Sequence, residues 1–153
     1  FDVGWDPQEV WSRKIYELFP YIDVLFMNET EALHYSGRET PEEAAREFAS
    51  LSRIAAVKLG KKGSLAAAEG RLYQAASFPV TAVDTTGAGD SFNAGFVYGF
   101  LTDRDITCCL RYGNACGALN VTALGGNTAF PDKAKLETFL EKQGQAEKNR
   151  RTS

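Results

Sequence analysis

Residues 84–95 read DTTGAGDSFNAG, and this run is the most informative part of the sequence. The apolar residues before it predict a short strand at 80–83, and those after it predict a helix from about Ser91 to Leu101. A glycine-rich turn that opens a helix directs backbone N–H groups at one point, where the helix dipole adds about half a positive charge. Gly87 and Gly89 allow an anion to approach closely. The run therefore predicts a hole for the negative charge of a phosphoryl group.

Two carboxylates flank this turn. Asp90 stands at the start of the helix, where an acid commonly caps the helix or interacts with its dipole. Asp84 lies on the other side of the turn, and this second acid favours a role beyond capping. The functional interpretation is that Asp90 accepts the proton of an attacking hydroxyl while the turn holds the transferred phosphate. Asp84 would then bind a cation or brace the loop.

Two other phosphate-binding motifs are excluded. A dinucleotide-binding fingerprint needs a third glycine three residues after the second, and Phe92 occupies that position. A P-loop needs Gly-x4-Gly-Lys followed by Ser or Thr, and the sequence contains no such run. The run GKKG at 60–63 lies between two predicted strands and opens no helix.

The rest of the chain alternates between predicted helices and strands, which indicates an α/β fold. Strands are expected at 1–3 (the end of a strand), 24–27, 54–59, 64–68, 71–75 and 80–83, with a hairpin turn at 69–70. Helices are expected from 6 to about 18, at 28–35, 41–51, 91–101 and 106–124, and from 131 onward. Gly95 and Gly99 lie four residues apart, which predicts close helix packing at that face.

Composition and charge exclude several classes of protein. The 153 residues are 44% hydrophobic with a net charge of -3, which argues against disorder and against nucleic acid as a partner. No apolar run is long enough to span a membrane. The three cysteines are read as reduced, so a cytoplasmic protein is expected. The length fits one domain, assigned to residues 1–145, followed by a charged tail at 146–153.

The run at 84–97 resembles the carboxy-terminal signature of the ribokinase-like carbohydrate kinases, the PfkB family. Three weaker pieces follow the family's order: NETEA at 28–32 resembles its Asn-x-x-Glu motif, VKLG at 57–60 resembles a strand end beside the nucleotide, and 114–131 resembles its adenine-side helix and loop. The resemblance covers residues 1 to about 140. It implies a three-layer α/β/α ribokinase-like sandwich with a mainly parallel sheet and an antiparallel hairpin.

The resemblance also implies roles for particular residues. The anion hole carries over to Gly87, Ala88 and Gly89, and the catalytic base to Asp90. Asn28 and Glu31 correspond to the family's magnesium–phosphate network, which acts through water. Asp84 and the Thr86 carbonyl, with the loop 123–127, correspond to a site for a potassium-like ion. The nucleotide contacts correspond to Lys58, Gly60 and Asn114. Simpler interpretations stay open, namely a helix cap for Asn28, a solvated acid for Glu31, a solvated side chain for Lys58 and a plain helical residue for Asn114.

The resemblance implies an ATP- and Mg²⁺-dependent sugar kinase, and K⁺ is a third candidate cofactor. This chain would be the carboxy-terminal, nucleotide-binding half and a partial domain, so turnover by the chain alone is not expected. It would form a homodimer or pair with the absent amino-terminal half, which would carry the residues that select the sugar. The alternatives are a nucleoside kinase of the same superfamily and a non-catalytic nucleotide-binding or assembly module.

Overall fold

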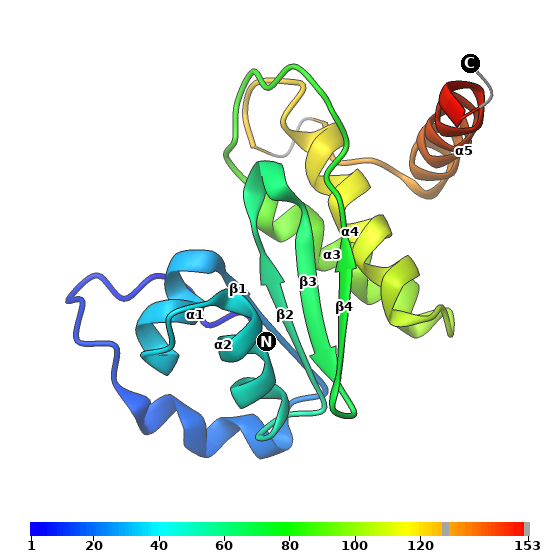
Figure 1. The fold of residues 1–153 in the computed structure, drawn as a ribbon. Coiled ribbons are helices and arrows are strands. Elements are labelled where there is room, and N and C mark those ends of the chain that lie inside the picture. The colour runs from blue at the N-terminus through cyan, green and yellow to red at the C-terminus, as the bar shows by residue number, and fades with distance from the viewer. Residues whose placement is uncertain (127–128, 152–153) are drawn as a thin grey trace. The chain divides into compact units, whose positions relative to one another are not determined.

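The computed structural model describes residues 1–126 and 129–151, with side chains as far as residue 145. Contacts within the chain divide it into two compact units, Phe1–Ser77 and Phe78–Ser153, and each is described here by itself. The first unit contains the β-sheet and the helices α1 and α2, whereas the second contains the helices α3, α4 and α5 (Figure 1).

The sheet of the first unit has four strands in the order β1-β2-β3-β4. The strands are β1 (Val24–Asn28), β2 (Ile54–Lys58), β3 (Ser64–Ala68) and β4 (Arg71–Ala75). β1 and β2 run parallel, with Asn28 beside Lys58 at their carboxyl ends. All four strands and the hairpin turn agree with the sequence-based expectation to within one residue.

The sheet is mixed, which corrects the expectation of a mainly parallel sheet. Among the described strands, only the β1–β2 pairing is parallel, whereas β2–β3 and β3–β4 are antiparallel. The short connections cause this balance, because parallel neighbours need a long crossover. β2 and β3 are joined through the short 3₁₀ helix η2 (Gly60–Lys62), and β3 and β4 through Glu69 and Gly70, both with positive φ.

Residues 1–3, where the end of a strand was expected, lie along the outer edge of β1. Asp2 forms a parallel bridge with Phe26. The Phe26 N–H donates to the Phe1 carbonyl at 2.7 Å, and the Val3 N–H donates to the Phe26 carbonyl at 3.1 Å. This segment therefore covers the backbone groups that an edge strand would expose.

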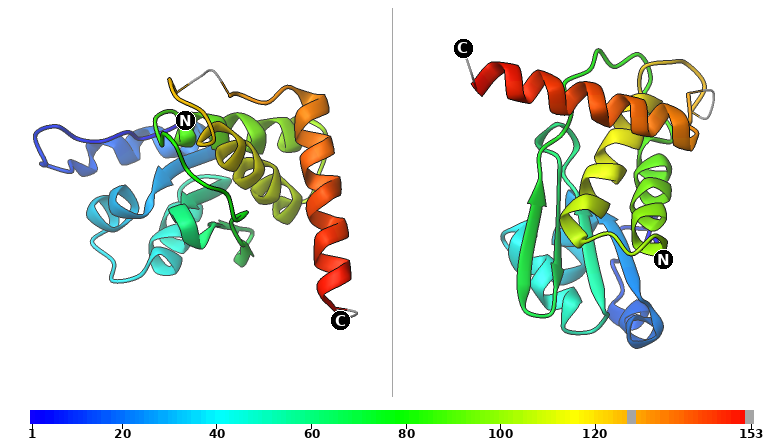
Figure 2. Two further views of the ribbon diagram at one scale, coloured as in Figure 1. Left: turned by 90° about the horizontal axis from the view of Figure 1, so that it is seen from above. Right: turned by 90° about the vertical axis from the view of Figure 1, so that its right-hand side faces the viewer.

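The helices α1 (Glu29–Ser36) and α2 (Pro41–Ala49) cover one face of the sheet (Figures 1 and 2). Both begin where expected: Asn28 caps α1, and the Thr40 side chain accepts the Glu43 N–H at 3.2 Å to cap α2. Alternate strand residues pack beneath them, which puts the core of this unit between helices and sheet. This core consists of Phe19, Leu25, Met27, Ala32, Tyr35, Ala44, Ala45, Phe48, Ala55, Val57, Leu65 and Ala67.

The helix expected at 6–18 does not form, and this prediction is wrong. The Asp6 carboxylate accepts the N–H groups of Gln8 at 3.0 Å and Trp11 at 2.8 Å, so it closes a loop rather than capping a helix. Glu9 and Trp11 have positive φ, which an α-helix does not allow. The chain instead forms a 3₁₀ helix, η1 (Arg13–Tyr21), which includes Pro20 and extends past the expected end near residue 18.

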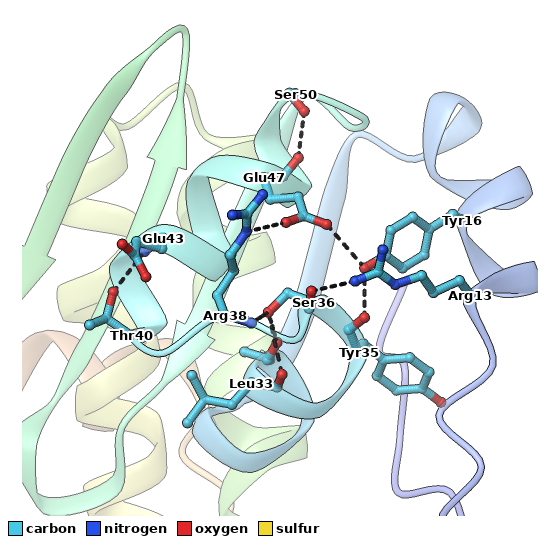
Figure 3. A network of polar contacts seen from close by, with 11 residues as sticks. Arg13, Tyr16, Leu33, Tyr35, Ser36, Arg38, Thr40, Glu43, Glu47 and Ser50 are labelled. Atoms are coloured by element: carbon cyan, nitrogen blue, oxygen red, sulfur yellow. Dashed lines mark hydrogen bonds and ion pairs between the residues drawn. The ribbon is translucent and has the colours of Figure 1, made fainter.

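A network of polar contacts ties η1 to the junction of α1 and α2 (Figure 3). Arg13 Nη2 donates to the Ser36 carbonyl at 2.6 Å, and the Tyr16 hydroxyl donates to the Tyr35 carbonyl at 2.8 Å. These donors satisfy carbonyls at the end of α1, which lack partners within their own helix. Glu47 lies 3.4 Å from the Tyr16 hydroxyl and pairs with Arg38 at 2.6 Å.

The second unit contains α3 (Ala88–Leu101), α4 (Ile106–Asn120) and α5 (Lys133–Arg151). α3 and α4 lie side by side, as Figure 2 shows, and a side chain at Gly95 would collide with the Tyr112 carbonyl at 2.6 Å. This contact confirms the predicted close packing. The strand expected at 80–83 is absent: these residues have no strand partner among the described residues, and the Val83 N–H donates instead to the Val121 carbonyl at 2.7 Å.

α5 packs through its first half. Leu136 is buried with Phe78, Ala115 and Cys116, and Phe139 lies against the same cluster. The backbone of α5 continues to Arg151 and so includes most of the residues assigned to a tail. Within the described ranges, no helix has the length and apolar character needed to cross a bilayer.

Tyr16→Phe should lower the free energy of unfolding by about 1 kcal/mol at pH 7, because the Tyr35 carbonyl loses its donor. Burial, helped by the nearby Glu47 carboxylate, raises the pKa of Tyr16 to about 12. The unfolded chain, with an ordinary tyrosine pKa of about 10, therefore releases this proton first as the pH rises. The difference in melting temperature between the wild type and Tyr16→Phe should be largest below pH 10 and should decrease as the pH rises towards 12.

Tyr21→Phe is the matched control, because the Tyr21 side chain is 88% exposed. Its melting temperature should follow the wild type at every pH. A Tyr16→Phe difference that does not narrow above pH 10 would contradict the assigned hydrogen bonds.

Candidate functional site

The predicted site residues fall into two groups, one in each unit. The group in the second unit is the turn that leads into α3. Gly87 has φ 73° and precedes the first helical residue, so the helix begins at Ala88, three residues earlier than expected. Asp90 therefore lies within the first turn.

The first turn of α3 leaves backbone donors free. Its first helical hydrogen bond joins the Ser91 N–H to the Gly87 carbonyl at 2.9 Å. Among the described residues, nothing accepts from the N–H groups of Gly89 and Asp90. Such groups at a helix N-terminus form an anion site, because their partial charges add to the helix dipole.

The Asp90 side chain is exposed and makes no hydrogen bond or ion pair within the described part of the chain. Gly87, rather than Asp90, holds the N-cap position, and no side chain caps this helix. The alternative in which Asp90 is the helix cap is therefore wrong. Its exposed carboxylate belongs to the first turn of α3 and can accept a proton from a hydroxyl.

Asp84 braces the turn. Its Oδ1 accepts the Thr86 N–H at 2.9 Å, and its Oδ2 accepts the Gly125 N–H at 3.0 Å. One carboxylate thus joins two loops that are far apart in the sequence. These N–H groups, Thr86 first and Gly125 second, hold the pKa of Asp84 below its ordinary value. Of the two roles expected for Asp84, the brace is observed.

The turn packs tightly against the loop after α4. A Cβ atom at Gly87 would collide with the Gly126 carbonyl, and one at Gly126 would lie 3.0 Å from Thr86 Cγ2. The N–H groups of Val83 and Asp84 donate to the Val121 carbonyl at 2.7 and 3.2 Å. Gly87 is therefore required for close approach to the protein's own backbone as well as for its positive φ.

Asn120 is a residue of this site that sequence reasoning missed. Its Nδ2 donates to the Thr86 carbonyl at 2.9 Å, and the residue is 1% exposed. The sequence feature that could have indicated this role is an asparagine near the end of an apolar helix, five residues before the glycine pair 125–126. Asn114, which was predicted to contact the nucleotide, is also buried on α4, at 8% exposure.

The group in the first unit includes Asn28 and Glu31, which form a capping box at the start of α1. Asn28 Oδ1 accepts the Glu31 N–H at 2.8 Å, and Glu31 Oε2 accepts the Asn28 N–H at 2.8 Å. The helix-cap interpretation of Asn28 is thus observed. Glu31 is 5% exposed, so its interpretation as a solvated acid is wrong.

Lys58 lies at the carboxyl end of β2, beside Asn28 in the sheet register. Its Nζ pairs with Asp2 Oδ2 at 2.7 Å, and its side chain is 15% exposed, so the solvated alternative is wrong. Asp2 was not singled out by the sequence, because only the strand bridge to Phe26 brings it here. Gly60 has φ 58°, and a Cβ there would meet nothing within 4 Å.

The described site residues provide oxygen ligands for Mg²⁺ or a monovalent cation, but they do not form a complete metal site by themselves. No three His, Cys, Asp or Glu side chains gather into a metal site in the part of the chain that the structure describes. Magnesium keeps several waters and is commonly held by substrate phosphates with one or two carboxylates, for which Glu31 is the candidate. The Asp84 carboxylate and the Thr86 carbonyl are oxygen donors of the kind that a monovalent cation requires.

Asp84→Asn should lower the melting temperature by a few degrees at pH 7, because an amide has one acceptor oxygen for two N–H groups. The lowered folded-state pKa means that this stabilisation is present above about pH 4 and is lost as the pH falls through the folded-state value. Thermal melts at pH 7 and pH 2.5 should therefore show a smaller difference between variant and wild type in acid. Asp103→Asn, on the exposed turn after α3, is the control, and a pH-independent difference would contradict the brace.

Comparison with known proteins places this chain in a family. The sequence matches the family described as pfkB family carbohydrate kinase over residues 3–133. A ribokinase from Haemophilus influenzae is 35% identical over 131 residues, which cover 82% of this chain and 43% of that protein. The chain therefore spans less than half the length of this relative.

Solved structures agree with the family match. An E. coli protein in complex with ATP and Mg²⁺ has a TM-score of 0.83 and 28% identity, covering 93% of this chain and 48% of its own. A Vibrio cholerae O395 fructokinase double mutant, bound to fructose, ADP and potassium ion, has a TM-score of 0.76 and 30% identity, covering 92% and 49%. These likenesses confirm the predicted ribokinase-like α/β fold. By sequence and by fold, this chain belongs to the pfkB family of carbohydrate kinases.

Proposed function

We propose that this chain supplies the ATP phosphate site, the anion hole and the catalytic base of a kinase that phosphorylates a sugar hydroxyl. The observation that carries the proposal is the start of α3, where the N–H groups of Gly89 and Asp90 have no acceptor among the described residues and share the first turn with the exposed Asp90 carboxylate. Donors for an anion and an acceptor for a proton are the two elements that phosphoryl transfer to an alcohol requires.

In this proposal, the sugar hydroxyl oxygen attacks the terminal phosphorus of ATP while the bond from that phosphorus to the bridging oxygen breaks. ADP leaves, and the hydroxyl proton passes to Asp90. Gly87, Ala88 and Gly89 hold the turn in which backbone N–H groups meet the transferred phosphoryl group. The positive φ of Gly87 and its packing against Gly126 keep that turn in one conformation.

The nucleotide side of the proposal uses Lys58, Gly60 and Asn114. Lys58 would reach a phosphate by exchanging or sharing its ion pair with Asp2, and the open space at Gly60 would let the nucleotide lie against the end of β2. Asn28 and Glu31 would orient water around the Mg²⁺ that accompanies ATP, which neutralises phosphate charge. The capping box holds the Glu31 carboxylate in place for this role.

A potassium ion is proposed at the Asp84 carboxylate and the Thr86 carbonyl, with the loop 123–127, of which residue 127 lies outside the described residues. The potassium ion bound to the similar fructokinase supports this assignment. The ion would strengthen the link between the turn and the loop that the Asp84 carboxylate already makes.

We further infer that the matched stretch is the carboxy-terminal half of the longer relatives. The parallel pairing of residues 1–3 with β1 supports a sheet that continues through the half not covered. That half, or a second copy in a homodimer, would be the partner of this chain and would carry the sugar-selecting residues. The family is consistent with a small-molecule substrate and a cytoplasmic protein.

Asp90→Asn in the full-length protein should lower kcat by about 10²–10⁴-fold, because the base is lost, while ATP affinity stays within a few-fold. Steady-state kinetics with a panel of sugars and nucleosides would measure both parameters and identify the substrate class. Asp103→Asn, an acid in the turn beyond the other end of α3, is the control and should retain full activity.

Full turnover by Asp90→Asn would exclude the base assignment. ATP binding by the wild type with no turnover on any sugar or nucleoside would support the non-catalytic module instead. Turnover on nucleosides alone would replace the sugar kinase with the nucleoside kinase.

Activity in KCl should exceed activity in LiCl at equal concentration, because the site is proposed to hold K⁺ and Li⁺ is a much smaller ion. Rates measured at constant ionic strength separate this effect from charge screening. Equal rates in the two salts would remove the potassium site from the proposal.

A further inference from the structure

Asn120, the last residue of α4, is buried but only half satisfied. Its Nδ2 donates to the Thr86 carbonyl at 2.9 Å. Its Oδ1 is also buried and has no hydrogen-bond partner among the described residues. The residue as a whole is 1% exposed.

The stability of the fold does not explain this residue. A buried amide oxygen without a donor opposes folding, whereas an apolar side chain of the same shape would fill the space without that penalty. What the asparagine gains is one contact, the hydrogen bond from its amide nitrogen to the backbone of the turn. The presence of an asparagine at this position is therefore explained by its hydrogen bond to the turn and not by packing in the core.

The held carbonyl determines how the next peptide group is oriented. In a trans peptide, the carbonyl of Thr86 and the N–H of Gly87 point in opposite directions. Anchoring the carbonyl on Asn120 therefore directs the Gly87 N–H to the other side of the peptide. Gly87 then enters α3, whose next free donors are the N–H groups of Gly89 and Asp90.

Two side chains thus fix the turn, one from the loop before it and one from the end of α4. Asp84 holds the Thr86 N–H, and Asn120 holds the Thr86 carbonyl, so both ends of one residue's backbone are anchored by side chains. Asn120 Nδ2 also lies 3.4 Å from where a Cβ of Gly87 would be. We propose that Asn120 is a positioning residue that orients the Thr86–Gly87 peptide and so sets the geometry of the anion hole, an inference that rests on the proposed nucleotide function.

Asn120→Leu separates positioning from stability. It keeps the approximate shape and removes the unpartnered oxygen, so the melting temperature should stay at or near that of the wild type. Amide hydrogen exchange in residues 84–90, measured by mass spectrometry without ligand, should become about tenfold faster. The Kd for the Mg²⁺ complex of AMP-PNP, measured by calorimetry, should rise about tenfold.

Leu136→Ala is the matched control, because Leu136 is buried in the same unit within a cluster that includes no residue of the turn. It should lower the melting temperature while leaving exchange at 84–90 as in the wild type. The proposal would be overturned if Asn120→Leu had the amide exchange rates and the AMP-PNP affinity of the wild type. It would also be overturned if Asn120→Leu melted at as low a temperature as Leu136→Ala and exchanged faster throughout the second unit. Faster exchange at 84–90 alone, with no AMP-PNP binding by the wild type, would support the role of Asn120 and overturn the nucleotide function.

Discussion

The Asp84 carboxylate, which accepts backbone N–H groups from both Thr86 and Gly125, is the interaction on which the candidate site depends. A turn that offers free N–H groups to an anion cannot use those groups to hold itself, so its conformation has to be fixed from outside. One carboxylate oxygen fixes the turn locally, and the other ties it to a loop forty-one residues later. The backbone collision that any side chain at Gly87 would meet shows how closely the two segments approach.

The same principle recurs in the first unit, where polar side chains hold backbone groups at the ends of elements. Asn28 and Glu31 cap α1 reciprocally, and the donors on Arg13 and Tyr16 satisfy the carbonyls at its other end. A helix fixed at both ends can present a buried carboxylate such as Glu31 in one orientation. Preorganised groups of this kind stabilise charge without reorganising during a reaction.

The sequence predicted those parts of the fold that depend on local chemistry. The glycine-rich turn, the start of α2 at Pro41 and the hairpin at 69–70 follow from residue types at fixed spacing, and the helix cap at Asn28 was one of the two interpretations left open. The helix expected after Asp6 failed because an aspartate that starts a helix can equally close a loop on its own backbone, and sequence spacing does not distinguish these outcomes. The expectation of a mainly parallel sheet came from the family resemblance, whereas the short connections on either side of β3 make both of its pairings antiparallel.

The parts of the site that could not be predicted are contacts between segments distant in sequence. Asp2 meets Lys58 only because residues 1–3 pair with β1, and Asn120 meets Thr86 only because α4 ends beside the turn. Neither Asp2 nor Asn120 belongs to a motif. The sequence pattern alone indicates an ordinary surface position for Asp2 and an ordinary helix position for Asn120. The early start of α3 has a similar origin, since the αL conformation of Gly87 is supported by the Gly126 loop.

Thermal melting of the 153-residue chain with and without MgATP, in potassium buffer, tests most directly whether this chain holds a nucleotide phosphate site. A ligand at 100 times its Kd stabilises a protein by about 2.7 kcal/mol, a change that a melt resolves clearly. A nucleotide phosphate site on this chain predicts a cooperative transition that MgATP moves to higher temperature. A cooperative transition at the same temperature with and without saturating MgATP would contradict it.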